Sequence, residues 1–290
     1  MIGKLARGSH GVVTRTELLA AGLTLKEIRH RLGTGALLRV HPSVYRVGHD
    51  APSIEATYLA AVRACGPGAL LSGRAAAHLL GLTKRRRAPR PEVTARTERR
   101  VAGVATRRCR KLEPADGMTW RGVPVTTVAR TLVDVAASLS LDDLARACHE
   151  AEVLHRTTPS EIATVLERRP GSRGAAKLRR IVEGDVRVTL SALERRFLRR
   201  LRAVRLPLPV TNRPAGGRYV DCRWPAHRLT VELDSYRFHH SRHSWEQDRR
   251  REREARARGD EFRRYTYGDV VDDPRYMLRE LHQLLAEHPA

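Results

Sequence analysis

The stretch RYVDCRWPAHRLTVELDSYRFHH, residues 218–240, decides how the second half of this chain folds. Two runs rich in β-branched and aromatic residues flank a short Pro-Ala-His-Arg turn, which predicts a β-hairpin. Apolar and polar residues alternate along both runs, so one face of the hairpin is apolar. The other face carries three acids, Asp221, Glu232 and Asp234, where a sheet favours uncharged side chains.

The turn determines which residues of the two strands lie opposite each other. With Ala226 and His227 at its centre, Asp221 pairs with Glu232, with their Cβ atoms about 5 Å apart, and Asp234 lies farther along the same face. Facing carboxylates repel, so this oxygen-rich arrangement predicts a bound Mg²⁺ or Mn²⁺ ion, which activates water for phosphodiester hydrolysis. The alternative is a solvent-exposed acidic face that nearby Arg residues balance.

The composition indicates a polyanionic partner. The 290 residues include 55 Lys and Arg against 32 Asp and Glu, a formal net charge of +23, although part of the Arg excess is typical of a GC-rich coding sequence. Nucleic acid is the default partner of such a chain. No apolar run approaches the roughly 20 residues that a membrane-spanning helix needs, and the N-terminus lacks a secretory signal. The four scattered cysteines form no C-x-x-C pair, so we expect reduced thiols in a cytoplasmic protein.

Residues 10–48 predict a winged helix-turn-helix. Two capping boxes, at 14–17 and 24–27, each open a short helix. The second helix has Leu25, Ile28 and Leu32 on its apolar face, and the alternating stretch ALLRVHPSVYRVG that follows predicts a two-stranded wing. The candidate DNA-contacting residues of the helix and the wing are Lys26, Arg29, His30, Arg31, Arg39 and Arg46. The alternative is a protein-binding winged helix whose basic residues are a solvated face.

Residues 51–170 predict an α+β connecting region, and residues 171–188 a basic linker. Helices are expected near residues 54–65, after Ser72, and in two stretches between 126 and 154, with short strands near 92–107. The histidines of this region have no ligand partner four residues on, so we expect them to pack or to lie on the surface.

The hairpin is flanked by the elements of a parallel unit. Upstream, the helix expected over 189–204 has one apolar face, with Glu194 at its edge. The residues of that face are Leu190, Leu193, Phe197, Leu201 and Val204. Downstream, a basic helix is followed by the strand EFRRYTY, so strand, helix and strand form a right-handed crossover.

This order of elements, with these acids, resembles the PD-(D/E)XK nuclease superfamily and, more narrowly, its very-short-patch-repair-like endonuclease branch. The resemblance covers roughly residues 189–285 and implies that Asp221 and Glu232 ligate Mg²⁺ or Mn²⁺. Asp234 stands where the superfamily usually has Lys, and it is a further candidate catalytic residue. The other residues that we place in this site are His239 as general acid or base, Glu194 and Asp248 as supporting groups, and Arg249 and Arg251 as phosphate contacts. Val220 and Ser235 depart from the motif's usual Pro and Gly.

The first half of the chain is similar to AbiEi-type antitoxins of abortive-infection systems. GVVTRTELLAAGLTLKEIRHRLGTGALLRVHPSVYRVG resembles their N-terminal winged-helix domain, and GVPVTTVARTLVDVAA resembles the region that follows. The resemblance implies DNA binding, transcriptional autoregulation and a cognate toxin.

The sequence thus predicts an α+β and α/β multidomain protein. Its expected parts are a winged helix-turn-helix at 1–50, an α+β region at 51–170, a linker at 171–188 and a restriction-endonuclease-like PD-(D/E)XK domain at 189–290. We expect a DNA-binding, Mg²⁺-dependent endonuclease tied to toxin–antitoxin or phage defence, with RNA left open as a target. One alternative is an autoregulator or antitoxin whose nuclease fold only binds nucleic acid. Another is a protein-interaction module that contacts a toxin.

Overall fold

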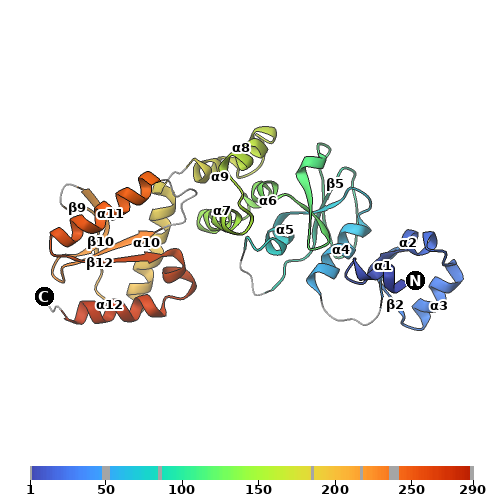
Figure 1. Ribbon diagram of the computed structural model, residues 1–290, viewed down its shortest axis with the longest axis horizontal. Helices are drawn as coiled ribbons and strands as arrows, with labels where there is room; N and C mark the ends of the chain where they lie inside the picture. The colour runs from blue at the N-terminus through green and yellow to red at the C-terminus, as the bar shows by residue number, and fades with distance from the viewer. Residues whose placement is uncertain are drawn as a thin grey trace. The chain divides into compact units, whose positions relative to one another are not determined.

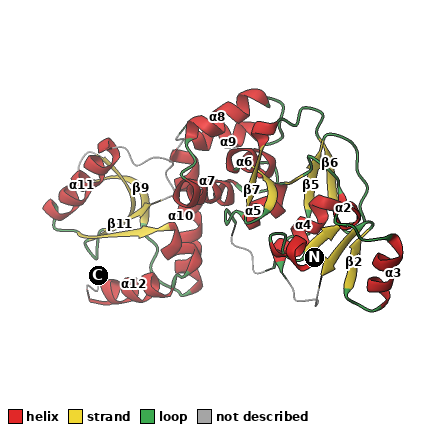
Figure 2. Cartoon of the chain, turned by 45° about the vertical axis from the view of Figure 1, so that its right-hand side comes forward, coloured by secondary structure: helices red, strands yellow, loops and turns green. Residues whose placement is uncertain are grey.

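The structure of this protein is a computed structural model, and it describes residues 2–47, 53–83, 87–183, 186–215, 218–234 and 242–287. The chain divides into two compact units, the first made of residues 1–138 and 150–175 and the second of residues 139–149 and 176–290. The described residues form helices and three β-sheets (Figures 1 and 2), which confirms the predicted mixed α/β multidomain class. No helix in these ranges is long and apolar enough to cross a membrane.

The first unit begins with two capped helices and a β-hairpin. The elements of this N-terminal region are α1 (Ile2–Arg7), β1 (Val12–Thr14), α2 (Arg15–Ala20), α3 (Leu25–Gly33), β2 (Leu37–His41) and β3 (Val44–Val47). The strands form an antiparallel sheet in the order β1-β3-β2. Both predicted capping boxes are present, with Thr14 and Glu17 at α2 and Thr24 and Glu27 at α3. The two helices and the hairpin are therefore confirmed.

The core of the N-terminal region differs from the prediction at one end of α3. Ile28 is almost fully buried, and Leu32 packs against the same core. Leu25, by contrast, is 54% exposed, so its predicted place on the apolar face is wrong. Leu25 begins the helix, and Leu23 in the preceding turn fills the core at this point instead.

A five-stranded sheet in the order β6-β5-β4-β8-β7 forms the rest of the first unit. Its strands are β4 (Leu70–Leu71), β5 (Glu92–Ala95), β6 (Ala105–Arg108), β7 (Gly117–Trp120) and β8 (Val123–Thr126). The helices around it are α4 (Ile54–Ala64), α5 (Gly73–Leu79), α6 (Val128–Val135), α8 (Pro159–Arg168) and the C-terminal part of α7 (Leu141–His155), with a 3-10 turn, η1 (Pro114–Asp116), before β7. Strand β4 is parallel to β8 and β5 to β6, whereas the other neighbours are antiparallel.

Helix α4 packs against both sheets of the first unit. Its buried residues include Ala56, Ala60 and Ala61, whose small side chains allow strands to approach closely. At its C-terminal end, Arg63 donates hydrogen bonds to the backbone oxygen of Val12 at 2.6 Å and to the carboxylate of Glu17 at 3.0 Å. Helix α4 therefore ties the N-terminal region to the five-stranded sheet.

A buried carboxylate, Asp116, joins helices of the first unit to the sheet. Arg130 of α6 and Arg169, just after α8, lie 3.2 and 2.8 Å from its oxygens. Burial by itself raises the pKa of Asp116, but a backbone hydrogen bond from Glu113 and the two arginines together lower it below its ordinary value. Asp116 is therefore ionised at neutral pH and compensates the buried guanidinium of Arg130.

The second unit contains a four-stranded sheet in the order β12-β11-β10-β9. Its elements are the N-terminal part of α7, α9 (Ala175–Val182), α10 (Val186–Ala203), β9 (Val210–Ala215), β10 (Arg218–Trp224), β11 (Leu229–Asp234), α11 (Arg242–Ala257), β12 (Glu261–Thr266), the π-helical turn η2 (Gly268–Asp272) and α12 (Arg275–Glu287). Strand β11 is parallel to β12, and the remaining pairs are antiparallel. Residues of α10 and α12 pack against the apolar face of the sheet, which includes Trp224 and Val231.

The predicted hairpin and its register are confirmed. Cys222 lies opposite Val231, and Trp224 lies opposite Leu229, as the turn at Ala226 requires. These four side chains are buried in one core, so the apolar face of the hairpin is also as predicted. The opposite face is buried as well: Thr230 and Glu232 are 1% and 8% exposed. Its polar groups therefore need partners inside the protein.

Two details of the flanking helices differ from the prediction. Part of the predicted basic linker is helix α9, because Ala175, Leu178 and Ile181 recur at helical spacing and are buried. Leu193, Phe197 and Leu201 of α10 are buried as predicted, but Val204 is 49% exposed, since α10 ends one residue before it.

Asp260, which precedes β12, provides the partners that the hairpin needs. Arg223 of β10 donates to both of its carboxylate oxygens at 2.8 and 2.9 Å, and the hydroxyl of Thr230 on β11 donates at 2.8 Å. Arg223 and Thr230 are themselves opposite each other in the hairpin. One buried acid thus fixes β12 to both strands of the hairpin. Burial by itself raises the pKa of Asp260, but Arg223 and Thr230 lower it below its ordinary value.

Because the folded-state pKa of Asp260 is lowered, its contribution to stability is present above the unfolded pKa of about 3.9 and is lost as pH falls through the folded value. We expect Asp260→Asn to reduce the free energy of unfolding by about 2 kcal/mol at neutral pH. On acidification, the free energy of unfolding should fall by less for the variant than for the wild type. Denaturant unfolding between neutral pH and pH values below the ordinary carboxyl pKa measures both effects.

The matched control is Asp273→Asn, since Asp273 forms an exposed pair with Arg275. Such pairs contribute little, so its unfolding should follow the wild type. Equal stability of the two variants would contradict the structural role of Asp260.

Candidate nucleic-acid interface

Helix α3 begins at a complete capping box. The side chain of Thr24 accepts from the backbone amide of Glu27, and the carboxylate of Glu27 accepts from the backbone amide of Thr24 at 2.8 Å. The hydrogen bonds from Thr24, backbone first, lower the pKa of Glu27. Glu17 has the same role in α2 and also pairs with Arg63. Both acids of residues 2–47 are therefore engaged in helix caps, and the remaining surface of α3 is basic.

The structure places the predicted basic residues of α3 on its surface. Lys26, Arg29 and His30 are exposed, and Arg31 is half-buried. The guanidinium of Arg31 lies 3.9 Å from Glu27 on the preceding turn, so this arginine has a partner inside the helix. Lys26, Arg29 and His30 are thus the members of the predicted set that the helix offers to an external polyanion.

The hairpin β2–β3 presents the two predicted wing residues differently. Arg39 on β2 is exposed, whereas Arg46 on β3 is half-buried and contacts other residues. Ser43 in the connecting turn has a positive φ of 61°, which gives the tight reversal between the strands. Burial lowers the pKa of His41 beside this turn, so that histidine is neutral at physiological pH. Arg39 is therefore the better placed of the two for a phosphate contact.

Two parts of the chain match families in comparisons with known proteins. Residues 2–48 match the family described as "Transcriptional regulator, AbiEi antitoxin", and residues 67–184 match "AbiEi antitoxin C-terminal domain". Both family models describe AbiEi antitoxins. The resemblance of the first half to AbiEi antitoxins is therefore confirmed, whereas the resemblance of residues 189–285 to PD-(D/E)XK nucleases stays a prediction.

Among solved structures, the chain is similar to the RV2827C protein from Mycobacterium tuberculosis. The two share 21% identity at a TM-score of 0.40, over 61% of this chain and 74% of the other. No curated protein matches the chain.

The second candidate site, the acidic hairpin, is described only in part. The backbones of Asp221 and Asp234 lie in β10 and β11. The confirmed register ends with Cys222 opposite Val231, one residue before the predicted pair of Asp221 and Glu232, which stays a prediction. The predicted site residues whose side chains lie outside the described part of the structure are Asp221, Asp234, Asp248, Arg251 and the whole of His239. Glu194 is half-buried on α10, and Arg249 is exposed on α11.

Glu232 is the acid of this hairpin whose side chain is described, and a guanidinium binds it. Arg264, its register neighbour on β12, donates from Nη2 to the carboxylate at 2.8 Å. In the described part of the chain, no group of three or more His, Cys, Asp or Glu residues could hold a metal ion. The predicted Mg²⁺ or Mn²⁺ site at Asp221 and Glu232 stays a prediction, because the side chain of Asp221 lies outside the described residues.

Two residues of this region were not among the predicted site residues. Arg264 pairs with Glu232, and Asp260 holds Arg223 and Thr230. The alternation of EFRRYTY puts Arg264 on one face of β12, but the residue of β11 that it contacts depends on the parallel register of the two strands. The sequence carries no comparable signal for Asp260, because Asp260 lies between a helix and a strand.

The capping box of α3 yields a direct test of the helix that carries the basic face. We expect Thr24→Ala to destabilise the N-terminal region by about 1 kcal/mol, because it removes the side-chain acceptor of the cap. Amide hydrogen exchange in the first turn of α3 should accelerate accordingly. Thr16→Ala, in the exposed part of α2, is the control and should leave exchange in α3 unchanged; equal effects of the two substitutions would contradict the cap's role.

Proposed function

We propose that this protein is a DNA-binding transcriptional regulator of the antitoxin type, whose residues 2–47 act as a winged helix-turn-helix. The observation that carries this proposal is the exposed basic surface of α3, whose one acid, Glu27, is engaged in the helix cap. The match of residues 2–48 to a transcriptional-regulator family supports it.

The geometry suggests how the region contacts a duplex. Helix α3 enters the major groove, where Lys26, Arg29 and His30 reach phosphates and base edges. Leu25, exposed at the first position of the helix, provides an apolar contact of the kind that thymine methyl groups accept. Arg39 of the hairpin contacts the adjacent phosphates.

A cognate toxin is the second partner that we propose. This part of the proposal rests on the AbiEi antitoxin match over residues 67–184. Binding of DNA by the N-terminal region and of a toxin by another part of the chain would make this protein an autoregulating antitoxin.

Salt-dependent binding to a fragment from upstream of its own gene tests the role of α3. We expect Arg29→Ala to weaken binding by about 1–3 kcal/mol if Arg29 contacts a base, or to reduce the salt slope by about 1 if it contacts phosphate. Fluorescence anisotropy at several salt concentrations distinguishes the two contacts.

The control for this measurement is Arg100→Ala, which removes an arginine that is exposed and paired with Glu98 in another part of the first unit. It removes the same charge, so it corrects for the effect of net charge alone. If Arg29→Ala and Arg100→Ala bind DNA with the same affinity and the same salt slope, insertion of α3 into the groove is refuted.

Metal-dependent hydrolysis of nucleic acid by the second unit is the other candidate function. One observation favours it: the observed hairpin register, with Cys222 opposite Val231, is the register on which the predicted pairing of Asp221 with Glu232 depends. The pairing of Glu232 with Arg264 disfavours it, since the guanidinium competes with a metal ion for the same carboxylate. We therefore propose nucleic-acid binding without cleavage for this unit.

Calorimetric titration of Mn²⁺ separates the two candidates. If the unit binds nucleic acid without cleaving it, titration of Mn²⁺ should give the same heat for the wild type, Glu232→Ala and Asp221→Ala. Plasmid DNA incubated with the wild type and Mn²⁺ or Mg²⁺ should stay intact. Plasmid cleavage that both variants lose would establish hydrolysis instead. An Mn²⁺ affinity that Arg264→Ala raises and Glu232→Ala abolishes would show that guanidinium and metal compete for one site.

A further inference from the structure

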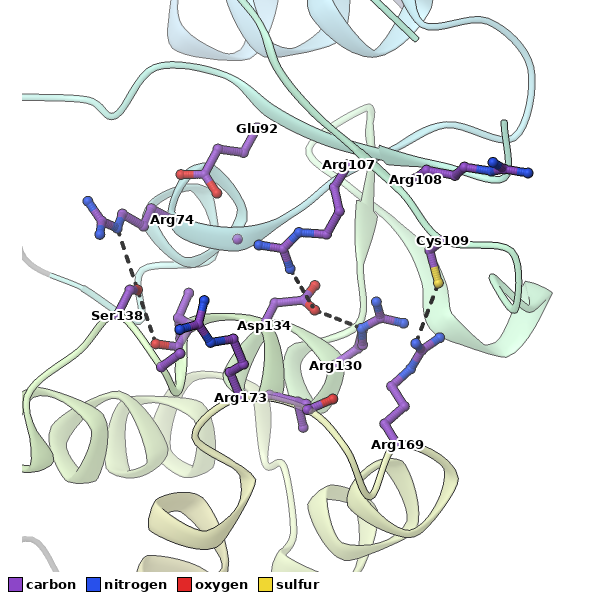
Figure 3. A pocket seen from close by; sticks show the side chains of 15 residues that line it. Arg74, Glu92, Arg107, Arg108, Cys109, Arg130, Asp134, Ser138, Arg169 and Arg173 are labelled. Carbon is purple, nitrogen blue, oxygen red and sulfur yellow. Dashed lines mark hydrogen bonds and ion pairs between the residues drawn. The ribbon is translucent and has the colours of Figure 1, made fainter. Parts of the chain in front are cut away.

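The first unit contains a cleft of about 580 Å³ that is rich in arginine. Its walls come from the start of α5, from β5 and β6, from the end of α6 and from the segment after α8 (Figure 3). The arginines that line it are Arg74, Arg107, Arg108, Arg130, Arg169 and Arg173. The whole cleft lies within residues 67–184, the part that matches the AbiEi antitoxin C-terminal domain.

The positive charge of this cleft exceeds the negative charge that the protein provides. Arg130 pairs with Asp116 and Asp134, and Arg169 pairs with Asp116. In the described part of the chain, neither Arg74 nor Arg173 has a carboxylate within ion-pair distance, and Arg107 has one only at 3.7 Å. Arg74 forms a long hydrogen bond of 3.5 Å to the hydroxyl of Ser138. The cleft thus holds guanidinium groups that an anion would neutralise.

Asp134 provides a second, different group in the same cleft. Its side chain is 6% exposed, and one oxygen, Oδ1, accepts from Nε of Arg130 at 3.0 Å. The other oxygen, Oδ2, is buried without a hydrogen-bond partner in the described structure. In Figure 3, Arg107 points toward this carboxylate from β6, and Arg173 extends into the cleft from the segment after α8. A buried acceptor without a donor is costly, so a ligand that donates a hydrogen bond here would be stabilised.

Glu92, the other acid of the cleft, lies at one edge of it. A Cβ added to Gly73 would lie 2.1 Å from Oε2 of Glu92, so glycine at this position leaves room for the carboxylate against the start of α5. In Figure 3 the side chain of Glu92 extends toward Arg74, away from Asp134. The space between Arg107, Arg173 and Asp134 therefore keeps its positive character.

We propose that this cleft binds a small organic phosphate that carries a hydroxyl group, such as a nucleoside monophosphate. The phosphate is held by Arg107 and Arg173, with Arg74 beside them, because guanidinium groups match phosphate oxygens in geometry and charge. A ligand hydroxyl donates to Oδ2 of Asp134, as a ribose hydroxyl does to an acid in other nucleotide sites. The volume is typical of small-molecule sites, whereas the convex backbone of a duplex does not enter a cleft of this size.

Isothermal titration calorimetry of the full chain tests this site with AMP, ribose 5-phosphate and inorganic phosphate at constant ionic strength. We expect AMP and ribose 5-phosphate to bind the wild type, and Arg173→Ala to weaken both by roughly tenfold or more. Arg173 is exposed, so this variant should fold normally. Asp134→Asn should weaken the two sugar phosphates more than it weakens inorganic phosphate, because inorganic phosphate lacks the sugar hydroxyl.

Arg100→Ala is the matched control, since it removes an arginine outside the cleft, and it should bind AMP as the wild type does. The proposal is overturned if AMP and ribose 5-phosphate do not bind at millimolar concentration, or if Arg173→Ala and Arg100→Ala bind them equally. It is also overturned if Arg173→Ala weakens only the binding of duplex DNA, which would assign the cleft to the nucleic-acid backbone.

Discussion

The pairing of buried carboxylates with guanidinium groups is the constraint on which this structure depends. Among the residues that the structure describes, Asp116, Glu232 and Asp260 are buried acids, and each is bound by at least one arginine. An isolated buried charge would cost several kcal/mol. In a chain with 55 Lys and Arg residues and 32 Asp and Glu residues, these pairs hold helices to a sheet in one unit and strands to one another in the other.

The arginines without acidic partners indicate where the protein meets other molecules. In the N-terminal region, Glu17 and Glu27 close the caps of α2 and α3, so Lys26 and Arg29 of α3 remain for an external polyanion. In the arginine-lined cleft, Asp134 compensates Arg130 but leaves Arg173 without a carboxylate. Basic surface and basic cleft suit different ligands because the first is convex and exposed while the second is concave and small.

The sequence was most informative where the signal is local. Each capping box needs only four consecutive residues, and the hairpin register follows from a short turn, so both could be predicted and are confirmed. The exposure of Leu25 could not be predicted from the sequence, because Leu23 takes its place in the core only when the turn packs on the sheet. The sequence also could not predict that Arg264 is the partner of Glu232, because the parallel register of β11 and β12 is set across an intervening helix.

The sequence by itself determined the helices, the hairpin, the basic character of α3 and the similarity of the first half to AbiEi antitoxins. These depend on neighbouring residues, on composition or on motif, all of which are contiguous along the chain. Only the tertiary structure decided that Glu232 is bound by Arg264, that Asp260 joins three strands and that Asp134 lies among arginines from distant segments. Charge pairing acts over a few ångströms in space, and residues far apart in sequence reach that distance only after the chain has folded.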